Sequence, residues 1–331
     1  MKLMSPMCLV LPLLLNAVGP DSKGVALCNA ARYGAKVKEC LIVKDQNGRP
    51  VADAKVWGGL QTGDGYNDYI PIEGSTDTNG EFIVEGKCTN RLSLRITKIG
   101  YYKGEFIMSY HDTTATPKVL DGKWQPFGTC RTIILKKQIG NWNLSVPDKK
   151  RHMSWQIPIY DKWLAYDLEK FDWCYPYGVG EHEDVLLFFT KYHKSWSEFK
   201  FTMDVSFTNN LFAGAYLMKK DESSDFKTTY LADTNATFQS SFHYIRERTA
   251  DRRRNFICLK QDDYLVFRTR TTVEEGILNE AYYGVIQGIW APDLESMELE
   301  DGCFNPIPND MNIEDWYYLR KKVQWSKESK Q

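Results

Sequence analysis

The sequence lacks an excess of charge of either sign. Its 42 Lys and Arg residues are balanced by 43 Asp and Glu residues, which gives a formal net charge of −1. A protein that binds nucleic acid through its overall field is normally strongly basic, so we expect no nucleic-acid partner. The one basic run, at residues 246–254, is interrupted by Glu247 and Asp251 and is typical of a solvated loop. We assign it no role from the sequence.

The sequence also lacks the short motifs of common catalytic and metal sites. It has no C-x-x-C, no H-x-x-x-H or H-x-H, no G-x-S-x-G, no Walker loop, and no G-x-G-x-x-G between a strand and a helix. Zinc ribbons, thioredoxin-type sites, zinc hydrolases and nucleophile elbows therefore have no support. We expect no catalytic residue, no metal and no cofactor, although 43 acidic residues leave a glycosidase-type carboxylate pair open.

Long apolar runs are absent except at the N-terminus. Lys2 is followed by an apolar stretch from Met7 to Leu15 and then by small residues. This order predicts a secretory signal peptide over residues 1–22, too short for a membrane anchor. Prolines in the same stretch disfavour the alternative of a buried helix. We expect a secreted, periplasmic or cell-surface protein without a transmembrane segment.

Cysteines are few, and their number is informative. Removal of Cys8 with the signal peptide leaves seven, so at least one stays free unless it pairs between chains or is modified. In an oxidising compartment some of the others should pair. Cys88 ends one predicted strand and Cys130 begins another, which favours a Cys88–Cys130 disulfide. Cys174 and Cys303 are a second candidate pair.

Strand and turn signals, without helical periodicity, run from Val37 to about Gln138. Apolar segments such as VKECLIVKD, EFIVEG and CRTIILKKQ are separated by turns that contain glycine, at Asn47-Gly48 and at residues 77–80. Short strands with turns at this spacing predict a β-sandwich. The glycine-rich stretch at residues 57–74 then has two interpretations: a ligand-binding loop, or an ordinary extension of a hairpin.

Three motifs occur in order within this region. They are G-x-P-V-x-x-A-x-V at residues 48–56, T-x-x-x-G-x-F at residues 76–82, and Gly100-Tyr101. Together they resemble the carboxypeptidase regulatory-like domain, a transthyretin-like, seven-stranded sandwich found in secreted and cell-surface proteins. The resemblance covers residues 36–139 and implies a structural or accessory module without a catalytic centre. The stretch between the first two motifs is longer than the family pattern.

That longer stretch includes the loop GDGYNDY, which concentrates carboxylate, amide and aromatic groups. Such oxygen atoms suit calcium or the hydroxyl groups of a sugar, and aromatic rings stack on pyranose rings. The EF-hand spacing is absent, which favours a solvated hairpin tip over a calcium site. The candidate ligand-binding residues are Trp57, Asp64, Tyr66, Asn67 and Asp68.

Beyond a boundary at residues 140–152, aromatic-rich and strand-like segments predict a second, mainly-β domain at residues 153–325. In FKFTMDVSF, alternate residues from Phe199 to Phe207 place an apolar face against a polar one, and a hairpin is expected across VEEGILN. The GEHED run at residues 180–184 is expected to be a solvated loop. Neighbouring residues of an extended segment point to opposite faces, so the run could rarely donate more than two metal ligands.

The predicted second domain should end in a short helix. Asn312 is a good N-cap, acidic residues follow at 314–315, and basic residues follow at 320–322. The preceding FNPIPND loosely resembles a segment of uncharacterised secreted bacterial proteins that carry the same N-terminal module. That resemblance brings no activity with it.

The expected fold is therefore mainly β: an N-terminal transthyretin-like, seven-stranded β-sandwich followed by a second mainly-β domain with a short C-terminal helix. The leading functional interpretation is an exported, non-catalytic protein with a binding, adhesion or scaffold role. Its expected partner is a carbohydrate or another surface protein. The alternative is a secreted hydrolase whose site lies in the aromatic-rich second domain. The absence of a catalytic constellation favours the first interpretation.

Overall fold

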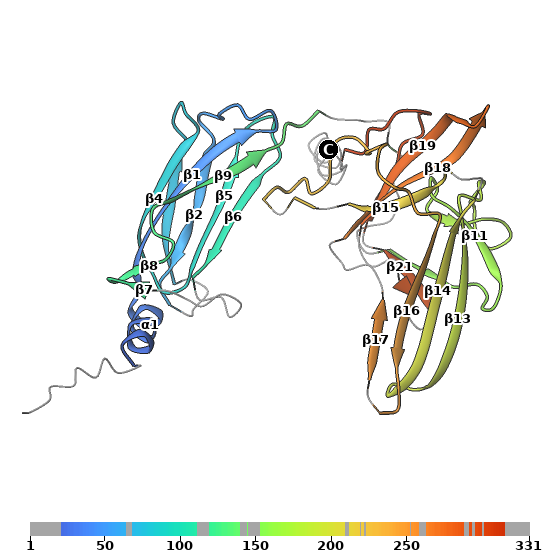
Figure 1. Cartoon of the computed structure of the whole chain (residues 1–331), viewed down its shortest axis with the longest axis horizontal. Helices are drawn as coiled ribbons and strands as arrows, with labels where there is room; N and C mark the ends of the chain where they lie inside the picture. Colours follow the sequence, from blue (N-terminus) through green and yellow to red (C-terminus); the bar gives the residue numbers. More distant parts are fainter. Residues whose placement is uncertain are drawn as a thin grey trace, which may run out of the picture. The chain divides into compact units, whose positions relative to one another are not determined.

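A computed structural model of the chain describes residues 21–63, 68–110, 119–139, 144, 153–208, 212–218, 220–221, 223–251, 253–257, 263–287, 291–292, 295–299 and 301–314. The chain divides into two compact units, Met1–Lys136 and Lys137–Gln331. Strands dominate both, and the described residues contain one helix, α1 (Asp21–Tyr33) (Figure 1). The predicted mainly-β fold is confirmed. The signal peptide predicted for residues 1–22 lies outside the described residues except for the first two residues of α1.

Helix α1 was not predicted from the sequence. It ends at a glycine: Gly34 has a φ of +75° and donates its N–H to the Ala30 carbonyl at 2.8 Å. A glycine in this left-handed conformation is a common way to end a helix. Ala30 is buried and Leu27 is partly buried against the core of the first unit, so tertiary contact holds the helix in place.

The first unit is a sandwich of two β-sheets. Its strands are β1 (Ala35–Asp45), β2 (Lys55–Gln61), β3 (Tyr69–Ser75), β4 (Glu81–Cys88), β5 (Arg91–Thr97), β6 (Gly104–Ser109), β7 (Val119–Leu120), β8 (Lys123–Trp124) and β9 (Thr129–Leu135). In one sheet β1 pairs antiparallel with β4 and parallel with β9, and in the other the order is β3-β2-β5-β6. Buried aliphatic side chains of both sheets, such as Leu41, Val56 and Leu94, form one shared core.

The glycine-rich stretch forms the hairpin β2–β3, in register from Lys55 opposite Ser75 to Gln61 opposite Tyr69. Its glycines allow close approach of backbones. A Cβ on Gly58 would lie 2.0 Å from the Ser93 carbonyl oxygen of the neighbouring strand β5. In this hairpin, glycine therefore serves strand packing.

The two predicted turn glycines are confirmed. Gly48 has a φ of +78° and Gly80 a φ of +74°, a conformation that costs other residues energy. Each turn is also held by an aspartate that accepts backbone N–H groups. Asp45 accepts from Asn47 at 2.8 Å, and Asp77 accepts from Glu81 at 2.7 Å.

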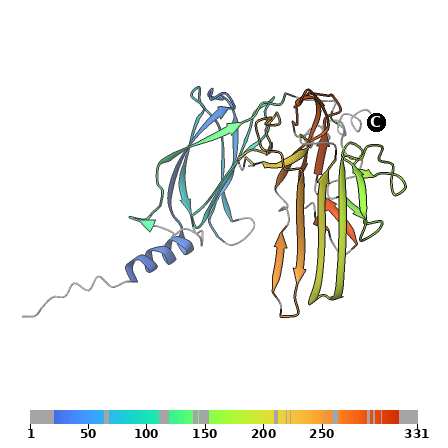
Figure 2. The same ribbon diagram turned by 45° about the vertical axis from the view of Figure 1, so that its right-hand side comes forward.

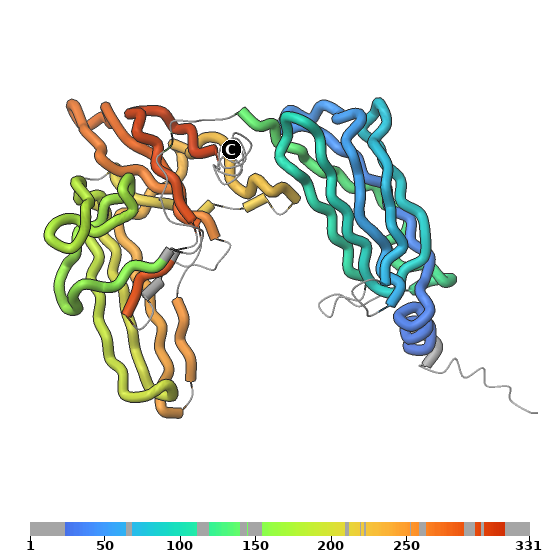
Figure 3. Tube along the Cα trace, turned by 180° about the vertical axis from the view of Figure 1, so that it is seen from behind, coloured from blue at the N-terminus to red at the C-terminus, as the bar shows by residue number. Residues whose placement is uncertain are grey.

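The described residues of the second unit form three sheets. Its strands are β10 (Met153–Gln156), β11 (Trp163–Asp167), β12 (Asp172–Trp173), β13 (Val185–Ser195), β14 (Glu198–Phe207), β15 (Gly214–Met218), β16 (Ser241–Arg248), β17 (Arg254–Ile257), β18 (Tyr264–Glu274), β19 (Ile277–Gln287), β20 (Ala291–Pro292), β21 (Ser296–Leu299) and β22 (Asp301–Phe304). The sheet orders are β12-β11-β13-β14-β16-β17, β15-β18-β19-β22 and β10-β21-β20. The tube trace in Figure 3 shows the long hairpins of this unit from behind.

The main core of the second unit lies between its two larger sheets. Leu187 and Met203 of the six-stranded sheet pack in one cluster with Phe267 and Ile286 of the four-stranded sheet. The alternation predicted for FKFTMDVSF is confirmed, because Phe199, Phe201, Met203, Val205 and Phe207 are all buried. The hairpin predicted across VEEGILN is β18–β19, which turns at Glu275 and Gly276, both with positive φ.

The predicted C-terminal helix lies outside the described residues beyond Glu314. The expected N-cap, Asn312, accepts the Glu314 N–H on its side-chain oxygen at 2.9 Å and forms a β-bridge with Leu231. Within the described residues, no helix has the length and apolar character required to cross a membrane.

Candidate functional site

Of the predicted ligand-binding residues, the structure describes Trp57 and Asp68, and it separates them. Asp64, Tyr66 and Asn67 lie outside the described residues. Asp68 closes the loop with its backbone, because its carbonyl accepts the Thr62 N–H at 2.7 Å. Trp57 lies four residues before Gln61, the last residue of β2, which is about 13 Å along an extended strand. Trp57 and Asp68 therefore belong to different parts of the hairpin.

Trp57 instead belongs to the outer face of sheet β3-β2-β5-β6. Its side chain is 45% exposed, and the Arg95 guanidinium lies over the ring, 5.0 Å from the centroid. Glu73 is directly opposite on β3. Tyr69, 40% exposed, lies on the same face, with its ring against Gly59. The face thus offers two exposed aromatic rings beside an arginine and a carboxylate, which is chemistry suited to stacking on, and hydrogen bonding to, a sugar ring.

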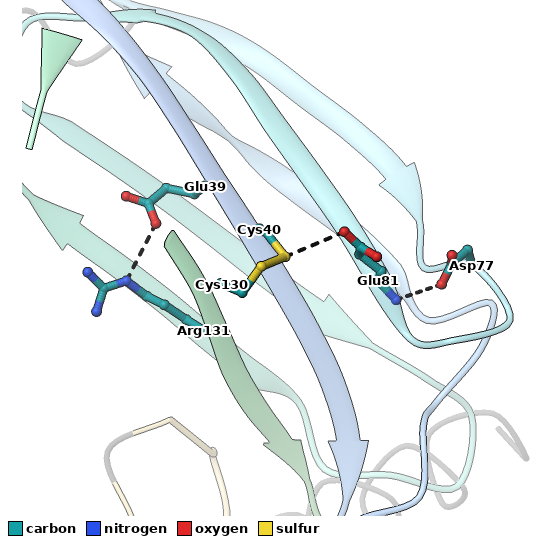
Figure 4. Close-up of a disulfide and its surroundings, with 6 residues drawn as sticks. All are labelled: Glu39, Cys40, Asp77, Glu81, Cys130 and Arg131. Atoms are coloured by element: carbon teal, nitrogen blue, oxygen red, sulfur yellow. Dashed lines mark hydrogen bonds and ion pairs between the residues drawn. A yellow bond between two sulfur atoms is a disulfide. The ribbon is translucent and has the colours of Figure 1, made fainter. Parts of the chain in front are cut away.

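Cys40 and Cys130 form a disulfide on the outer face of the other sheet (Figure 4). The parallel register of β1 and β9 places them directly opposite each other, with Cα atoms 4.3 Å apart. A Glu81 carboxylate oxygen lies 3.5 Å from the Cys40 sulfur. The Cα atoms of a disulfide are usually about 4.4–6.8 Å apart, so this pair lies at the short end of that range. The two cysteines are 90 residues apart in the sequence.

The predicted Cys88–Cys130 disulfide is wrong. Cys88 lies on β4, opposite Ala35, whereas Cys130 lies on β9, on the other side of β1 and five residues further along it. Five residues of strand span about 17 Å, too far for a disulfide. The second candidate pair is wrong as well, because Cys174 and Cys303 are both buried and no disulfide joins them.

The buried thiols of Cys88 and Cys174 are poor nucleophiles. Burial raises the pKa of Cys88 to about 12 and that of Cys174 to about 11. Since the thiolate is the reactive form, neither is active near neutral pH. Cys174 is buried, and its thiol donates to the His182 carbonyl at 3.3 Å.

A buried carboxylate lies within the first sandwich, one residue before the disulfide. Glu39 is fully buried, and it accepts from the Tyr110 hydroxyl at 3.1 Å and from the Arg131 Nε at 3.4 Å. Burial raises the pKa of Glu39, while Tyr110 and Arg131 oppose that shift. Figure 4 shows Arg131 reaching Glu39 from β9, the strand that carries Cys130. The group has a hydrogen-bonding role in the core.

A second polar cluster surrounds Arg270 in the second unit. Its Nε and one Nη bind both oxygens of Asp184, each at 3.0 Å. The same guanidinium contacts Asp167 at 3.2 Å and Glu169 at 2.5 Å. Arg270 has a φ of +49° and lies in an irregular section of the β18–β19 ladder, between Thr269 and Thr272. The bulge directs one arginine at three carboxylates.

The carboxylates of this cluster are held by the backbone as well as by Arg270. Asp167 is fully buried, and although burial favours its neutral form, N–H donors that include Lys170, Glu181 and His182 lower its pKa. For Asp184 burial prevails and the pKa is raised, despite the hydrogen bonds from Arg270. A carboxylate with this many partners joins loops and strands together; it has little capacity left to act on a substrate.

The expectation of a solvated loop at GEHED is wrong for the two residues at its ends. Glu181, His182 and Glu183 are exposed, but Gly180 is buried, and Asp184 is buried and paired with Arg270. The sequence carried a signal for this pairing that was missed: two arginines lie inside the apolar strand YLVFRTRTT, and a buried arginine requires a carboxylate partner. Within the described part of the chain, no group of three or more His, Cys, Asp or Glu side chains could hold a metal ion.

Comparison with known proteins gives structural likenesses of low score. The 3-chlorocatechol 1,2-dioxygenase of Rhodococcus opacus 1CP is 16% identical, with a TM-score of 0.26, over 32% of this chain and 62% of that one. Catechol 1,2-dioxygenase from Acinetobacter sp. ADP1 is 11% identical, with a TM-score of 0.24, over 32% and 54%. A streptococcal ancillary pilin is 12% identical, with a TM-score of 0.21, over 80% and 58%.

This chain therefore spans less than two thirds of the length of each of these structures. At these scores and identities we draw no conclusion about function from them. No protein-family model matches the sequence, and no curated protein matches it.

Proposed function

We propose that this chain is an exported, non-catalytic protein that acts outside the cytoplasm as a binding or scaffold module. The observation that carries the proposal is the Cys40–Cys130 disulfide. Disulfides of this kind persist in oxidising compartments and are rare in the cytosol. The N-terminal apolar segment and the resemblance of residues 36–139 to the carboxypeptidase regulatory-like domain agree with export.

The polar clusters of the described residues support a non-catalytic role. Glu39 is enclosed in the first core, and Asp167 and Asp184 are bound by backbone N–H groups and by Arg270. A hydrolase needs an acid, base or nucleophile that can reach its substrate. These groups support the fold instead, so no observation here favours the hydrolase alternative.

Within this proposal, the ligand is a carbohydrate and the outer face around Trp57 and Tyr69 binds it. The rings of both residues are at least 40% exposed. Arg95 and Glu73 flank Trp57 and supply donors and acceptors for hydroxyl groups.

Export is tested by fusing residues 1–40 to a reporter that is active only after secretion, with a charged substitution in the apolar stretch, Leu13→Arg, as the control. Peptide mapping of the mature protein without reduction should then recover Cys40 linked to Cys130. A reporter that remains inside the cell, together with reduced Cys40, would exclude the proposal.

Carbohydrate binding is tested on a glycan array with the full chain and with Trp57→Ala. Trp163→Ala is a matched control, because Trp163 is also exposed, at 53%, but belongs to the second unit. Binding should fall at least tenfold for Trp57→Ala and remain for Trp163→Ala. An array that stays blank with the unaltered protein would count against the carbohydrate ligand, while leaving the export result intact.

A further inference from the structure

One face of two long hairpins in the second unit carries charge of a single sign. Hairpins β13–β14 and β16–β17 run past the other strands of the unit (Figures 1 and 2). Since directly opposed residues of antiparallel strands share a face, the register assigns each side chain to a face. The row nearer the core consists of Lys191, Phe201, Arg246 and Phe256, and the row beyond it of His193, Phe199, Arg248 and Arg254. We call these eight side chains the basic face; Phe199 and Phe201 within it are buried, and the other six are exposed or partly exposed.

The basic face holds four Lys or Arg side chains and no carboxylate, whereas the opposite face of the same strands is balanced. There, Lys194 pairs with Glu198 at 2.9 Å, and Lys200 lies opposite Glu247. Glu247 interrupts the basic run in the sequence but points to the other side of the sheet. Strand alternation thus converts a run of mixed charge into one positive face and one neutral face.

The like charges of the basic face destabilise the folded state. Arg248 and Arg254 lie directly opposite each other, and like charges in this position destabilise a strand pair. The Arg248 Nη1 donates to the Trp196 carbonyl at 3.1 Å, while its Nε is buried without an acceptor among the described atoms. Among the residues that the structure describes, Lys191 pairs with Glu295 at 3.8 Å. A bound anion would relieve the repulsion.

The geometry of the basic face restricts what could bind there. Neighbouring strands are about 4.8 Å apart, so the row from Lys191 to Phe256 spans about 14 Å across four strands. A peptide strand added at the edge of β17 would meet Arg254 and Phe256 but would not reach Lys191. The occupant must therefore lie across the strands and present several acidic groups.

Hydrogen-bonding chemistry further restricts the class of molecule that could bind to the basic face. Lysine and arginine side chains only donate, and the His193 ring is the one side chain of the basic face with an acceptor atom, so the face offers little to accept the N–H groups of a peptide. An acidic polysaccharide offers carboxylate, ether and hydroxyl oxygens as acceptors. It also offers sugar rings that can stack on Phe256, which is 49% exposed. We propose that the basic face binds an acidic, carboxylate-bearing polysaccharide.

The test is affinity electrophoresis of the full chain in native gels that contain polygalacturonate, with dextran as the neutral control. Migration should be retarded by polygalacturonate alone, and the retardation should weaken as salt rises because exposed charges are screened. Equal retardation by dextran would overturn the proposal. Equal affinity for poly-glutamate or for a single-stranded oligonucleotide would also overturn it, because the face would then recognise charge without the sugar.

Paired variants distinguish binding at the basic face from an effect of the protein's net charge alone. Arg248→Gln with Arg254→Gln removes two charges from the basic face, and Lys194→Gln with Lys200→Gln removes two from the opposite face. We expect the first pair to weaken binding at least tenfold and the second less than twofold; equal losses would contradict the proposal. Arg254→Glu should weaken binding and raise the melting temperature, because it places a carboxylate opposite Arg248. Trp57→Ala, in the other unit, should leave this binding unchanged whatever its effect on the glycan array.

Discussion

Cys40 and Cys130 lie directly opposite each other on neighbouring parallel strands, so that one covalent bond joins the first long strand of the sandwich to its last. The bond closes a separation of 90 residues. A cross-link of that length restricts the unfolded chain and is worth about 4 kcal/mol of stability.

Replacement of Cys40 and Cys130 by serine should therefore lower the free energy of unfolding of the first unit by about 4 kcal/mol. Urea titration of the oxidised protein and of the double variant measures the difference. Reductant should destabilise the native protein and have no effect on the variant. Cys28→Ser, at an exposed free cysteine on α1, should change neither curve. If reductant leaves the native protein unchanged, the two cysteines are not linked.

Glu39 should make the stability of the first unit depend on pH. Because burial raises its pKa, the folded state holds the proton more tightly than the unfolded state does. The stability that this proton provides is fully present below the unfolded pKa, near 4.5, and is lost as pH rises through the folded pKa. Glu39→Gln keeps an acceptor for Tyr110 and removes this loss.

The free energy of unfolding of Glu39→Gln, relative to that of the native protein, should therefore increase between pH 4.5 and pH 7. Urea titrations at a series of pH values supply the comparison. Glu85→Gln, at an exposed carboxylate paired with Lys38 on the same sheet, should not reproduce the trend. Parallel pH profiles for Glu39→Gln and the native protein would show that Glu39 titrates normally.

Features set by short-range chemistry could be predicted from the sequence. The alternating burial of β14 follows from side-chain alternation in a strand, and the left-handed conformation of Gly48 and Gly80 follows from turn composition. Helix α1 was missed because, among its described side chains, Leu27 and Ala30 alone pack on the core, so it lacks the broad apolar stripe that marks a helix.

Features set by sheet order could not be predicted. Cys130 had several possible partners, and the choice depends on β9 pairing with β1 on the side away from β4. Likewise, the ion pair between Arg270 and Asp184 forms because two segments that are distant in the sequence lie side by side in the fold. Trp57 was grouped with the loop at Asp68 by proximity in the sequence, although they lie at different points of the hairpin.

Arg270 should be the most costly single charge to remove from the second unit. Arg270→Met leaves Asp167, Asp184 and Glu169 without their shared cation, and breaking a buried ion pair in this way costs about 3–5 kcal/mol. Part of the loss should be recovered at acid pH, because protonation of Asp184 removes an unpaired charge.

Thermal unfolding of Arg270→Met at pH 7 and pH 4.5 checks both effects. Arg253→Met is the control, since Arg253 is an exposed arginine of the same unit with a surface pairing to Asp251. It should stay within about 0.5 kcal/mol of the native protein. Equal stability of the two variants would mean that the carboxylates are satisfied by the backbone alone.

Substitution of Gly48 and of Gly80 separates two costs of adding a side chain: that of the left-handed backbone conformation and that of a steric clash. Both have similar positive φ values, but a Cβ on Gly48 would meet nothing within 4 Å, whereas a Cβ on Gly80 would lie 2.3 Å from the Val43 carbonyl oxygen. Gly48→Ala should therefore cost only the left-handed conformation, about 1–2 kcal/mol. Gly80→Ala must also move the backbone of β1 and should cost clearly more. Urea titration of both variants measures the difference; equal losses would mean that the turn at residues 77–80 adjusts without displacing β1.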